Sequence, residues 1–257
     1  IYNDINGIER LLEERHKRGD DSVRNVTNVS DNVDANITVF SLEAEPSHRL
    51  IEFCENNKVP MVCLLMMGLR TYLQKFNYQD DVSIMSTVAR RATISEKKSG
   101  GTRVHCFPCR TIVNKEETFM EGIEKIREAQ NNLFRHANYN PVEYLNYRTS
   151  FYNEPGQTYE PLSLTYQPLT MKDVKQRTGQ TIDFSGIDYK TNWYSNGACA
   201  HTLYLTVMHR SNDNGLNFSF EYKTGRVTPE KLEYMYYYIC KILFEGIKNP
   251  YKSIGEI

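Results

Sequence analysis

The order of hydrophobic and polar residues along this 257-residue chain predicts strands interspersed with long helices. Residues 37–42 have the pattern of a strand, and residues 46–57 that of a helix. Residues 61–76 are apolar on nearly every side, which predicts a helix buried on most of its faces. Apolar positions also recur at helical spacing in residues 117–134 and 229–246. The chain therefore has the mixed pattern of an α/β protein.

Further segments have the pattern of strands. Residues 80–91 and 100–111 are short and apolar, contain arginine at their ends, and are separated by a basic, glycine-containing loop. Residues 203–208 and 216–222 alternate between two faces, and residues 211–215 between them have turn composition. This second pair is predicted to form a β-hairpin.

These elements predict an α/β two-layer sandwich, in which helices cover one face of a mixed β-sheet. The strands that contain Ile84, Val104, Leu205 and Phe218 should belong to one sheet. Residues 167–197 are polar and irregular. A segment of that length without regular structure is usually functional in a compact domain.

Composition argues against several classes of function. The chain has 31 basic and 32 acidic residues, so its net charge of −1 favours neither nucleic acid nor an anionic membrane as a partner. No apolar run approaches the roughly 20 residues of a membrane span. The six cysteines are scattered rather than arranged as a disulfide framework, which is typical of a reducing compartment. We therefore expect a cytoplasmic protein.

Most isolated chemical motifs are better explained as structure. Cys106 and Cys109 are spaced as in redox or zinc sites, but they lie in a predicted strand and lack further ligands nearby, so we interpret them as packed thiols. His136 precedes Pro141 in a predicted turn, and nothing in the sequence supplies an acid to orient it as a general base. No nucleophile elbow or phosphate-binding loop is present in the sequence.

Arg91 and Arg110 are the stronger candidates for a functional role. A guanidinium keeps its charge and offers a rigid fork of donors, so a buried strand that delivers one can hold an anionic group. The alternative for both residues is a surface ion pair of small energetic value.

In sequence these segments resemble the second half of the condensation domain of nonribosomal peptide synthetases. Residues 80–91 are similar to the family's "IGTPVAGR" strand, and residues 100–111 to its "VGFFVNTLPLR" strand. Residues 50–61, 135–143 and 216–230 are similar to "LARRHGVTLN", "HQDVPFE" and "LEYNTDLFD". The chain departs from the family where Met85, Ser86 and Thr87 replace Gly-Thr-Pro, where Arg90 replaces glycine, and where Cys-Phe-Pro-Cys replaces Asn-Thr-Leu-Pro.

The resemblance implies a fold like that of chloramphenicol acetyltransferase and other CoA-dependent acyltransferases. It also implies amide-bond formation in secondary metabolite biosynthesis, between acyl and aminoacyl thioesters on carrier proteins. The family's His-His-x-x-x-Asp-Gly motif is absent from the sequence, in which the six histidines are isolated. We therefore expect a C-terminal lobe that begins after that motif and contains no catalytic residue or metal site of its own.

The resemblance also implies partners and an internal organisation. The expected partners are an N-terminal condensation lobe, acyl and peptidyl carrier proteins bearing phosphopantetheine, and a neighbouring adenylation domain; no cofactor is bound directly. Residues 1–36 would form a leading helix and linker, and residues 37–169 the first part of the sandwich. Residues 170–197 would form a latch-like crossover, and residues 198–257 the hairpin and closing helix. A floor loop is expected near residues 92–101.

Arg91 and Arg110 would support the active site structurally. In the family, the aspartate of the histidine motif pairs with an arginine at the position of Arg91. Arg90 would point to the opposite strand face. In this chain Arg91 should be partly exposed or paired with a substitute carboxylate. Two other interpretations use the same fold: a stand-alone acyltransferase that uses coenzyme A or a free acceptor, and a non-catalytic lobe that docks carrier proteins.

Overall fold

The structure is a computed structural model that describes a defined part of the chain. It covers residues 34–91, 93–101, 103–140, 162–168, 194–210, 213 and 215–257, with the separate positions 143, 146, 174, 175, 181 and 182. The predicted leading helix and linker lie almost wholly outside the described residues, and so does most of the predicted latch.

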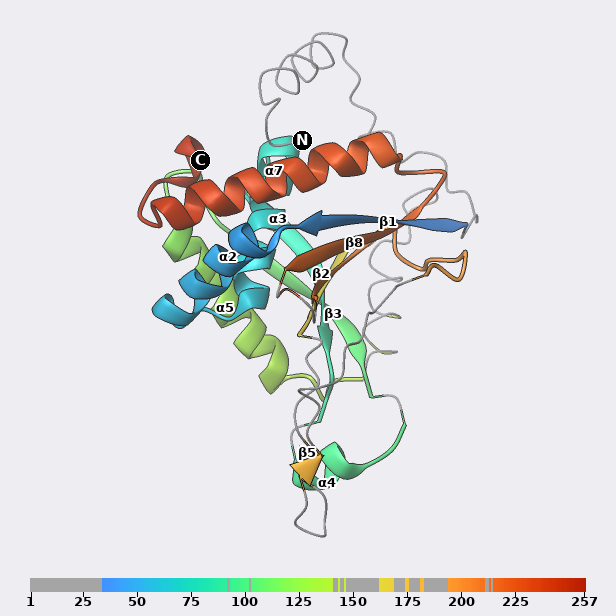
Figure 1. Ribbon diagram of the computed structural model, residues 1–257. Helices are drawn as coiled ribbons and strands as arrows, with labels where there is room; N and C mark the ends of the chain where they lie inside the picture. Colours follow the sequence, from blue (N-terminus) through green and yellow to red (C-terminus); the bar gives the residue numbers. More distant parts are fainter. Residues whose placement is uncertain are drawn as a thin grey trace. The chain divides into compact units, whose positions relative to one another are not determined.

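Six strands form one mixed β-sheet in the order β1-β8-β7-β4-β2-β3 (Figure 1). The strands are β1 (Ala35–Leu42), β2 (Asp81–Val88), β3 (His105–Ile112), β4 (Leu162–Gln167), β7 (Leu203–His209) and β8 (Leu216–Lys223). Strand β4 runs parallel to both β2 and β7, and the other neighbours are antiparallel. The prediction of a single mixed sheet is confirmed, with Val104 directly before β3.

The long helices pack on one face of this sheet, as predicted (Figure 1). They are α2 (Ala44–Asn57), α3 (Met61–Asn77), α5 (Phe119–Arg135) and α7 (Pro229–Lys248). Capping side chains fix where two of them begin. Thr118 and Glu121 form a reciprocal capping box at α5, and the Thr228 side chain accepts a hydrogen bond from the Lys231 amide at α7.

The core lies between the sheet and these helices. Phe119 of α5 and Phe218 and Phe220 of β8 are fully buried in it. Each such side chain contributes about 1.5–3 kcal/mol through burial. The close contact between α7 and α5 requires glycine at position 246, because a Cβ on Gly246 would lie 2.5 Å from the Phe119 ring.

Three local features differ from the sequence-based predictions. Strand β4 was not predicted, although it occupies a central position in the sheet. A short helix, α4 (Ile94–Lys98), lies within the expected floor loop. In the expected latch, β5 (Val174–Lys175) and β6 (Thr181–Ile182) form a short antiparallel ladder. The role of that segment as a latch stays a prediction.

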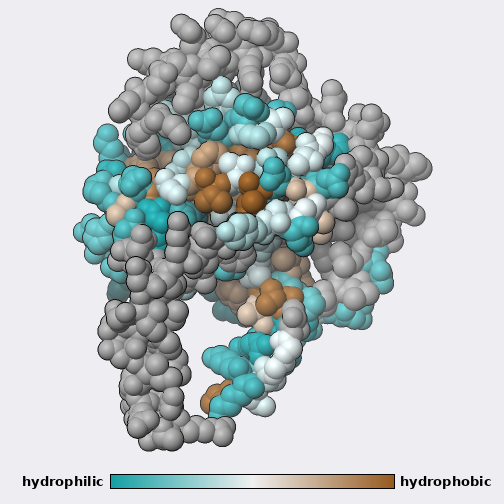
Figure 2. All heavy atoms as spheres, turned by 45° about the vertical axis from the view of Figure 1, so that its right-hand side comes forward, coloured by the Kyte–Doolittle hydropathy of each residue, from teal (hydrophilic) through white to brown (hydrophobic). Residues whose placement is uncertain are grey.

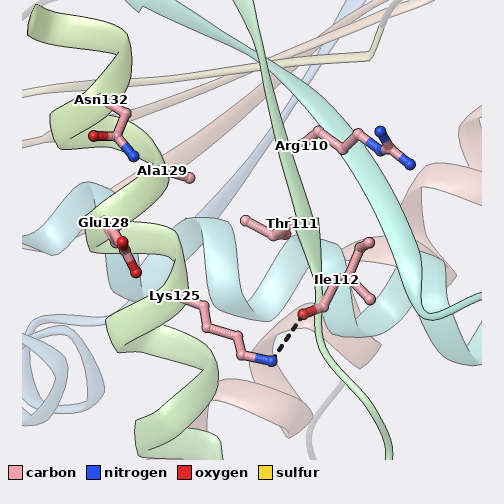
Figure 3. Close-up of a pocket in the computed structure, with 7 residues that line it drawn as sticks. All are labelled: Arg110, Thr111, Ile112, Lys125, Glu128, Ala129 and Asn132. Atoms are coloured by element: carbon pink, nitrogen blue, oxygen red, sulfur yellow. Dashed lines mark hydrogen bonds between the residues drawn. The ribbon is translucent and has the colours of Figure 1, made fainter.

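Strand β3 is the last strand of the described sheet, and two features modify its outer edge. The amide of Val113, just after the strand, donates to the Asp80 carbonyl at 3.2 Å, so by alternation the amide position of Pro108 faces away from β2. Proline has no N–H to offer there. The Lys125 ammonium of α5 donates to the Ile112 carbonyl at 3.1 Å (Figure 3).

Candidate functional site

The face of the sheet opposite the helices carries a row of short polar side chains, which we call the hydroxyl row. The strand register places its members on adjacent strands, and they are Ser219, Thr206, Thr165, Thr87 and Cys106. Side chains alternate between the faces of a strand. The neighbours of these residues along each strand, such as Phe218 and Leu164, lie in the helix-covered core.

Three hydroxyl groups around the middle of the row form a triangle. The Thr165 hydroxyl lies 2.7 Å from the Thr87 hydroxyl and 2.7 Å from the Tyr204 phenol, and the third side measures 3.3 Å. The Cys106 thiol approaches Thr87 at 3.6 Å. Because each hydroxyl has one proton, a closed triangle uses all three as donors and leaves lone pairs as its remaining capacity. The triangle can therefore accept hydrogen bonds from ligand N–H or O–H groups.

Ser219, another member of the hydroxyl row, has unused hydrogen-bonding capacity. Its side-chain oxygen is buried and has no hydrogen-bond partner in the described part of the chain, and the residue is 3% exposed. A buried hydroxyl without a partner costs about 1–3 kcal/mol. Such groups usually indicate a water, ion or polar partner that completes the site.

His201 lies beside the row and is held by Ser163 of β4. The Ser163 hydroxyl and His201 Nδ1 are 2.7 Å apart, and the His201 ring centroid is 5.4 Å from that of Tyr204. Burial, followed by the charge of Lys223, lowers the pKa of His201 below its usual 6.5. The imidazole is therefore neutral at pH 7, and the site carries no added charge from it.

The depressed pKa of His201 predicts a pH dependence of stability. The unfolded chain binds the proton more readily, so stability rises with pH through the window just below 6.5 and is lost as the pH falls through it. His201→Gln, which does not titrate, should flatten the slope of the unfolding free energy against pH between about pH 5 and pH 7. Urea unfolding at several pH values measures this slope. His48→Gln, at an exposed position in α2, is the control; equal slopes for the native chain and His201→Gln would contradict the prediction.

Arg91 organises the loop that follows β2. Its Nη1 donates to the carbonyls of Glu96 at 2.8 Å and Ser99 at 2.5 Å, and its Nη2 donates to the Gly101 carbonyl at 2.7 Å. The side chain is half-buried, as expected for a partly exposed residue. Among the described residues its acceptors are these carbonyls and, at 3.5 Å, the Ser99 hydroxyl, and not the substitute carboxylate that was the alternative to exposure. The guanidinium thus ties together the α4 segment, residues 93–101.

Two expectations for the end of β2 are corrected. The strand ends at Val88, three residues before Arg91, so strand alternation does not govern Arg90 and Arg91. Arg90 has φ of 48°, in the left-handed region. Glycine adopts this conformation without strain. The geometry therefore gives a physical reason for glycine at this position in the sequences that the segment resembles.

Arg110 does not lie at a strand end or near Arg91. Antiparallel pairing sets Arg110 opposite Ser83, whereas Val88 pairs with His105 at the other end of β2. Arg110 Nη2 lies 2.5 Å from Asp81 Oδ2, and these hydrogen bonds lower the pKa of that carboxyl group. An exposed pair of this kind contributes about 0–1 kcal/mol. The structure therefore does not bring the two arginines together.

The cysteine and histidine candidates are also placed. Cys106 lies in the hydroxyl row, while Cys109 faces the core, where burial raises its pKa to about 11. Both are free thiols, and the prediction of a packed thiol agrees with the burial of Cys109, whereas Cys106 is only partly buried. His136 is exposed at the end of α5. In the part of the chain that the structure describes, no three His, Cys, Asp or Glu side chains are placed to hold a metal ion, and no helix is long and apolar enough to cross a membrane.

A shallow pocket lies between β3 and α5 (Figure 3). Its lining residues are Arg110, Thr111, Ile112, Lys125, Glu128, Ala129 and Asn132. In Figure 3 the Arg110 guanidinium points away from α5, and Lys125 is committed to the Ile112 carbonyl. The charged groups therefore do not converge on one point, and the hydroxyl row is the better candidate site.

Sequence reasoning missed the hydroxyl row because it missed β4. The strand supplies Thr165 and Ser163, and its sequence alternates as Leu-Ser-Leu-Thr-Tyr-Gln. That alternation was the available signal. The partners of Thr165 lie 78 and 39 residues away in the chain, so the triangle itself has no local signature.

Comparisons with known proteins agree on one family. A family model described as "Condensation domain" matches residues 20–257. A subunit of plipastatin synthase from Bacillus subtilis (strain 168) is 24% identical over 223 residues, which is 85% of this chain and 8% of that protein. Surfactin synthase subunit 1 of the same organism is 23% identical over 218 residues, or 85% of this chain and 6% of that protein. The chain thus spans less than a tenth of these curated relatives.

Solved structures show the same fold. The first condensation domain of the CDA synthetase has a TM-score of 0.70 at 18% identity, and the match covers 98% of this chain and 55% of that one. The X-domain from teicoplanin biosynthesis has a TM-score of 0.66 at 16% identity, covering 97% of this chain and 60% of that one. The expected acyltransferase-like α/β fold is therefore confirmed.

Proposed function

The chain belongs to the condensation-domain family, and on this basis we propose that it forms the C-terminal lobe of a nonribosomal peptide synthetase condensation domain. In the intact domain, the amine of a carrier-bound aminoacyl group attacks a carrier-bound acyl thioester. A C–N bond forms, the C–S bond breaks, and the amine proton passes through a base to the leaving thiolate. We assign that base to a His-His-x-x-x-Asp-Gly motif on the partner lobe, and no catalytic residue to this chain.

The observation that carries the proposal is the hydroxyl row on the helix-free face. Among the described residues the long helices pack on the other face of the sheet, and we propose that this face forms a wall between two lobes. Its triangle of Thr87, Thr165 and Tyr204 accepts hydrogen bonds without introducing charge. Phosphopantetheine arms carry amide and hydroxyl groups of matching polarity. Carrier proteins would deliver these arms, so the lobe needs no cofactor of its own.

We propose that the α4 segment is the floor loop. Arg91 fixes the segment through three carbonyl hydrogen bonds, so its shape is set before a substrate arrives. We propose that Arg91 supports the site in this way, and that in the intact domain it also faces the aspartate of the histidine motif. Arg110 has no part in this arrangement, because antiparallel pairing places it at the other end of β2.

A condensation assay with two carrier-bound thioesters tests the proposal. The chain alone should give only background amide formation, because it supplies no base. In the intact domain, Tyr204→Phe removes one hydroxyl from the triangle and should lower turnover by about tenfold, the effect of about one lost hydrogen bond in a dry site. Tyr194→Phe, whose residue is 82% exposed, is the matched control.

The same assay separates the proposal from its alternatives. If the chain alone forms amide and His201→Gln abolishes this activity, the base lies on this lobe. That result would contradict the proposal that the partner lobe supplies the base. Turnover with a free acyl-coenzyme A in place of a carrier would support a stand-alone acyltransferase. Carrier binding by an intact domain that forms no amide would support a non-catalytic docking lobe.

A further inference from the structure

Arg90 is held in an unfavourable state at the end of β2. Its φ of 48° places a side-chain-bearing residue in the left-handed region, which is disfavoured for residues other than glycine, asparagine and aspartate. Backbone strain of this kind persists where the surroundings enforce it, and it gathers at functional sites.

The guanidinium of Arg90 is also incompletely hydrogen-bonded. Its Nε is buried and has no hydrogen-bond partner among the residues that the structure describes. Its one hydrogen bond to the described residues runs from Nη2 to the Asn138 carbonyl, at 3.3 Å. By contrast, the neighbouring Arg91 donates to three carbonyls at 2.5–2.8 Å. Most N–H donors of the Arg90 guanidinium therefore have no acceptor among the described residues.

The chain segment that follows Arg90 is basic. The α4 segment contributes Lys97 and Lys98, both exposed, and it appears mostly hydrophilic in Figure 2. Its carboxylate, Glu96, accepts from the Thr93 amide at 2.9 Å and pairs with Arg103 at 3.1 Å. Because the whole chain has a net charge of −1, this is a local concentration of positive charge. A site here would favour anions.

We propose that Arg90 anchors an oxyanion site that takes a carboxylate or a phosphate monoester. The Nε and Nη2 donors lie on one edge of the guanidinium, the geometry that receives two oxygens of one anion. Binding would turn this edge away from Asn138 and replace one long hydrogen bond with a charge-assisted pair. The proposal concerns a residue that departs from the sequences the segment resembles, and it does not depend on carrier proteins or on condensation activity.

Titration of the chain with inorganic phosphate and with acetate, at constant ionic strength set by chloride, tests the proposal. Constant ionic strength removes general screening effects. The amide NMR signals of residues 88–91 and 136–140 should shift with at least one probe. Arg90→Gly should weaken the binding of that probe by about tenfold or more, because it removes the charge-assisted pair. Glycine also adopts the left-handed backbone conformation of this position without strain. Lys98→Ala removes one charge from the same basic segment and should change the affinity less than threefold, by roughly the value of one exposed charge.

The variants make the outcomes distinguishable. Arg90→Lys keeps the charge without the fork and should show an intermediate loss, which also tests the site if the glycine variant unfolds. Tighter binding of phosphate than acetate would identify a phosphate site, and the reverse order a carboxylate site. Equal affinities for the native chain and Arg90→Gly would overturn the proposal, as would the lack of any response to both probes. The result is independent of the condensation assay.

Discussion

Replacing Arg70 with alanine is expected to lower the free energy of unfolding by about 3–5 kcal/mol, because it disrupts a buried polar network. Arg70, in α3, is fully buried. Its guanidinium donates to the Gln74 side-chain oxygen at 2.9 Å and to the Asp80 carbonyl at 2.8 Å. Gln74 in turn donates to the Asp80 carboxylate and to the Val113 carbonyl, each at 2.7 Å. The network therefore joins α3 to the start of β2 and the end of β3.

Burial lowers the pKa of Arg70 to about 10, so the side chain is charged at pH 7. Removing it leaves the Gln74 side-chain oxygen without this donor, leaves the Asp80 carbonyl with only the Val113 amide, and opens a cavity in the core. Equilibrium urea unfolding provides the measurement. Lys75→Ala, at an exposed position of the same helix, should change the free energy of unfolding by less than about 0.5 kcal/mol. Similar losses in both variants would show that the network does not hold these elements together.

Arg91→Ala should lower stability by about 2 kcal/mol through the loss of charge-assisted hydrogen bonds, a value reduced because the side chain is only half-buried. The expected structural effect is specific: the α4 segment loses the guanidinium that joins its carbonyls. Hydrogen exchange should accelerate for residues 96–101, while the core helices keep their protection. In the intact domain, where an aspartate partner would also be left unpaired, the expected cost rises to about 3–5 kcal/mol and activity falls with it.

Arg103→Ala is the matched control, since it removes a partly exposed arginine from the same loop. Its ion pair with Glu96 should contribute only about 0–1 kcal/mol. In the intact domain, Arg90→Ala should change stability and activity far less than Arg91→Ala. Equal effects of these two alanine substitutions would contradict the supporting role proposed for Arg91.

The layers of the fold could be predicted from sequence because the burial of one face of a helix or strand makes its apolar residues recur at a regular spacing. Residues 61–76 are apolar on nearly all sides, and the structure packs α3 into the core. The hairpin strands alternate, and β7 and β8 pair as expected. Strand β4 escaped prediction because it is short, and its alternation of Leu, Ser, Leu, Thr, Tyr and Gln is weakly hydrophobic. A central strand of six residues contributes few positions to a periodic signal.

The candidate site could be predicted only in part. The resemblance predicts a role for Arg91, but the carbonyls that accept its hydrogen bonds have no sequence signature. Arg110 looked equivalent to Arg91 because both close an apolar segment. Antiparallel pairing reverses the direction of the second strand, so equivalent positions in sequence become opposite ends in space. Long-range contacts such as that between Thr87 and Thr165 appear only when the strand order is known.

The outer edge of β3 has a consequence for self-association. A second chain that added a strand there would need alternating donors and acceptors along the edge. It would meet no donor at Pro108, and at Ile112 it would meet a carbonyl already bound to the Lys125 ammonium. Proline and an inward-reaching lysine are features by which proteins protect sheet edges from aggregation. This edge of the described sheet is therefore protected against growth into an intermolecular sheet.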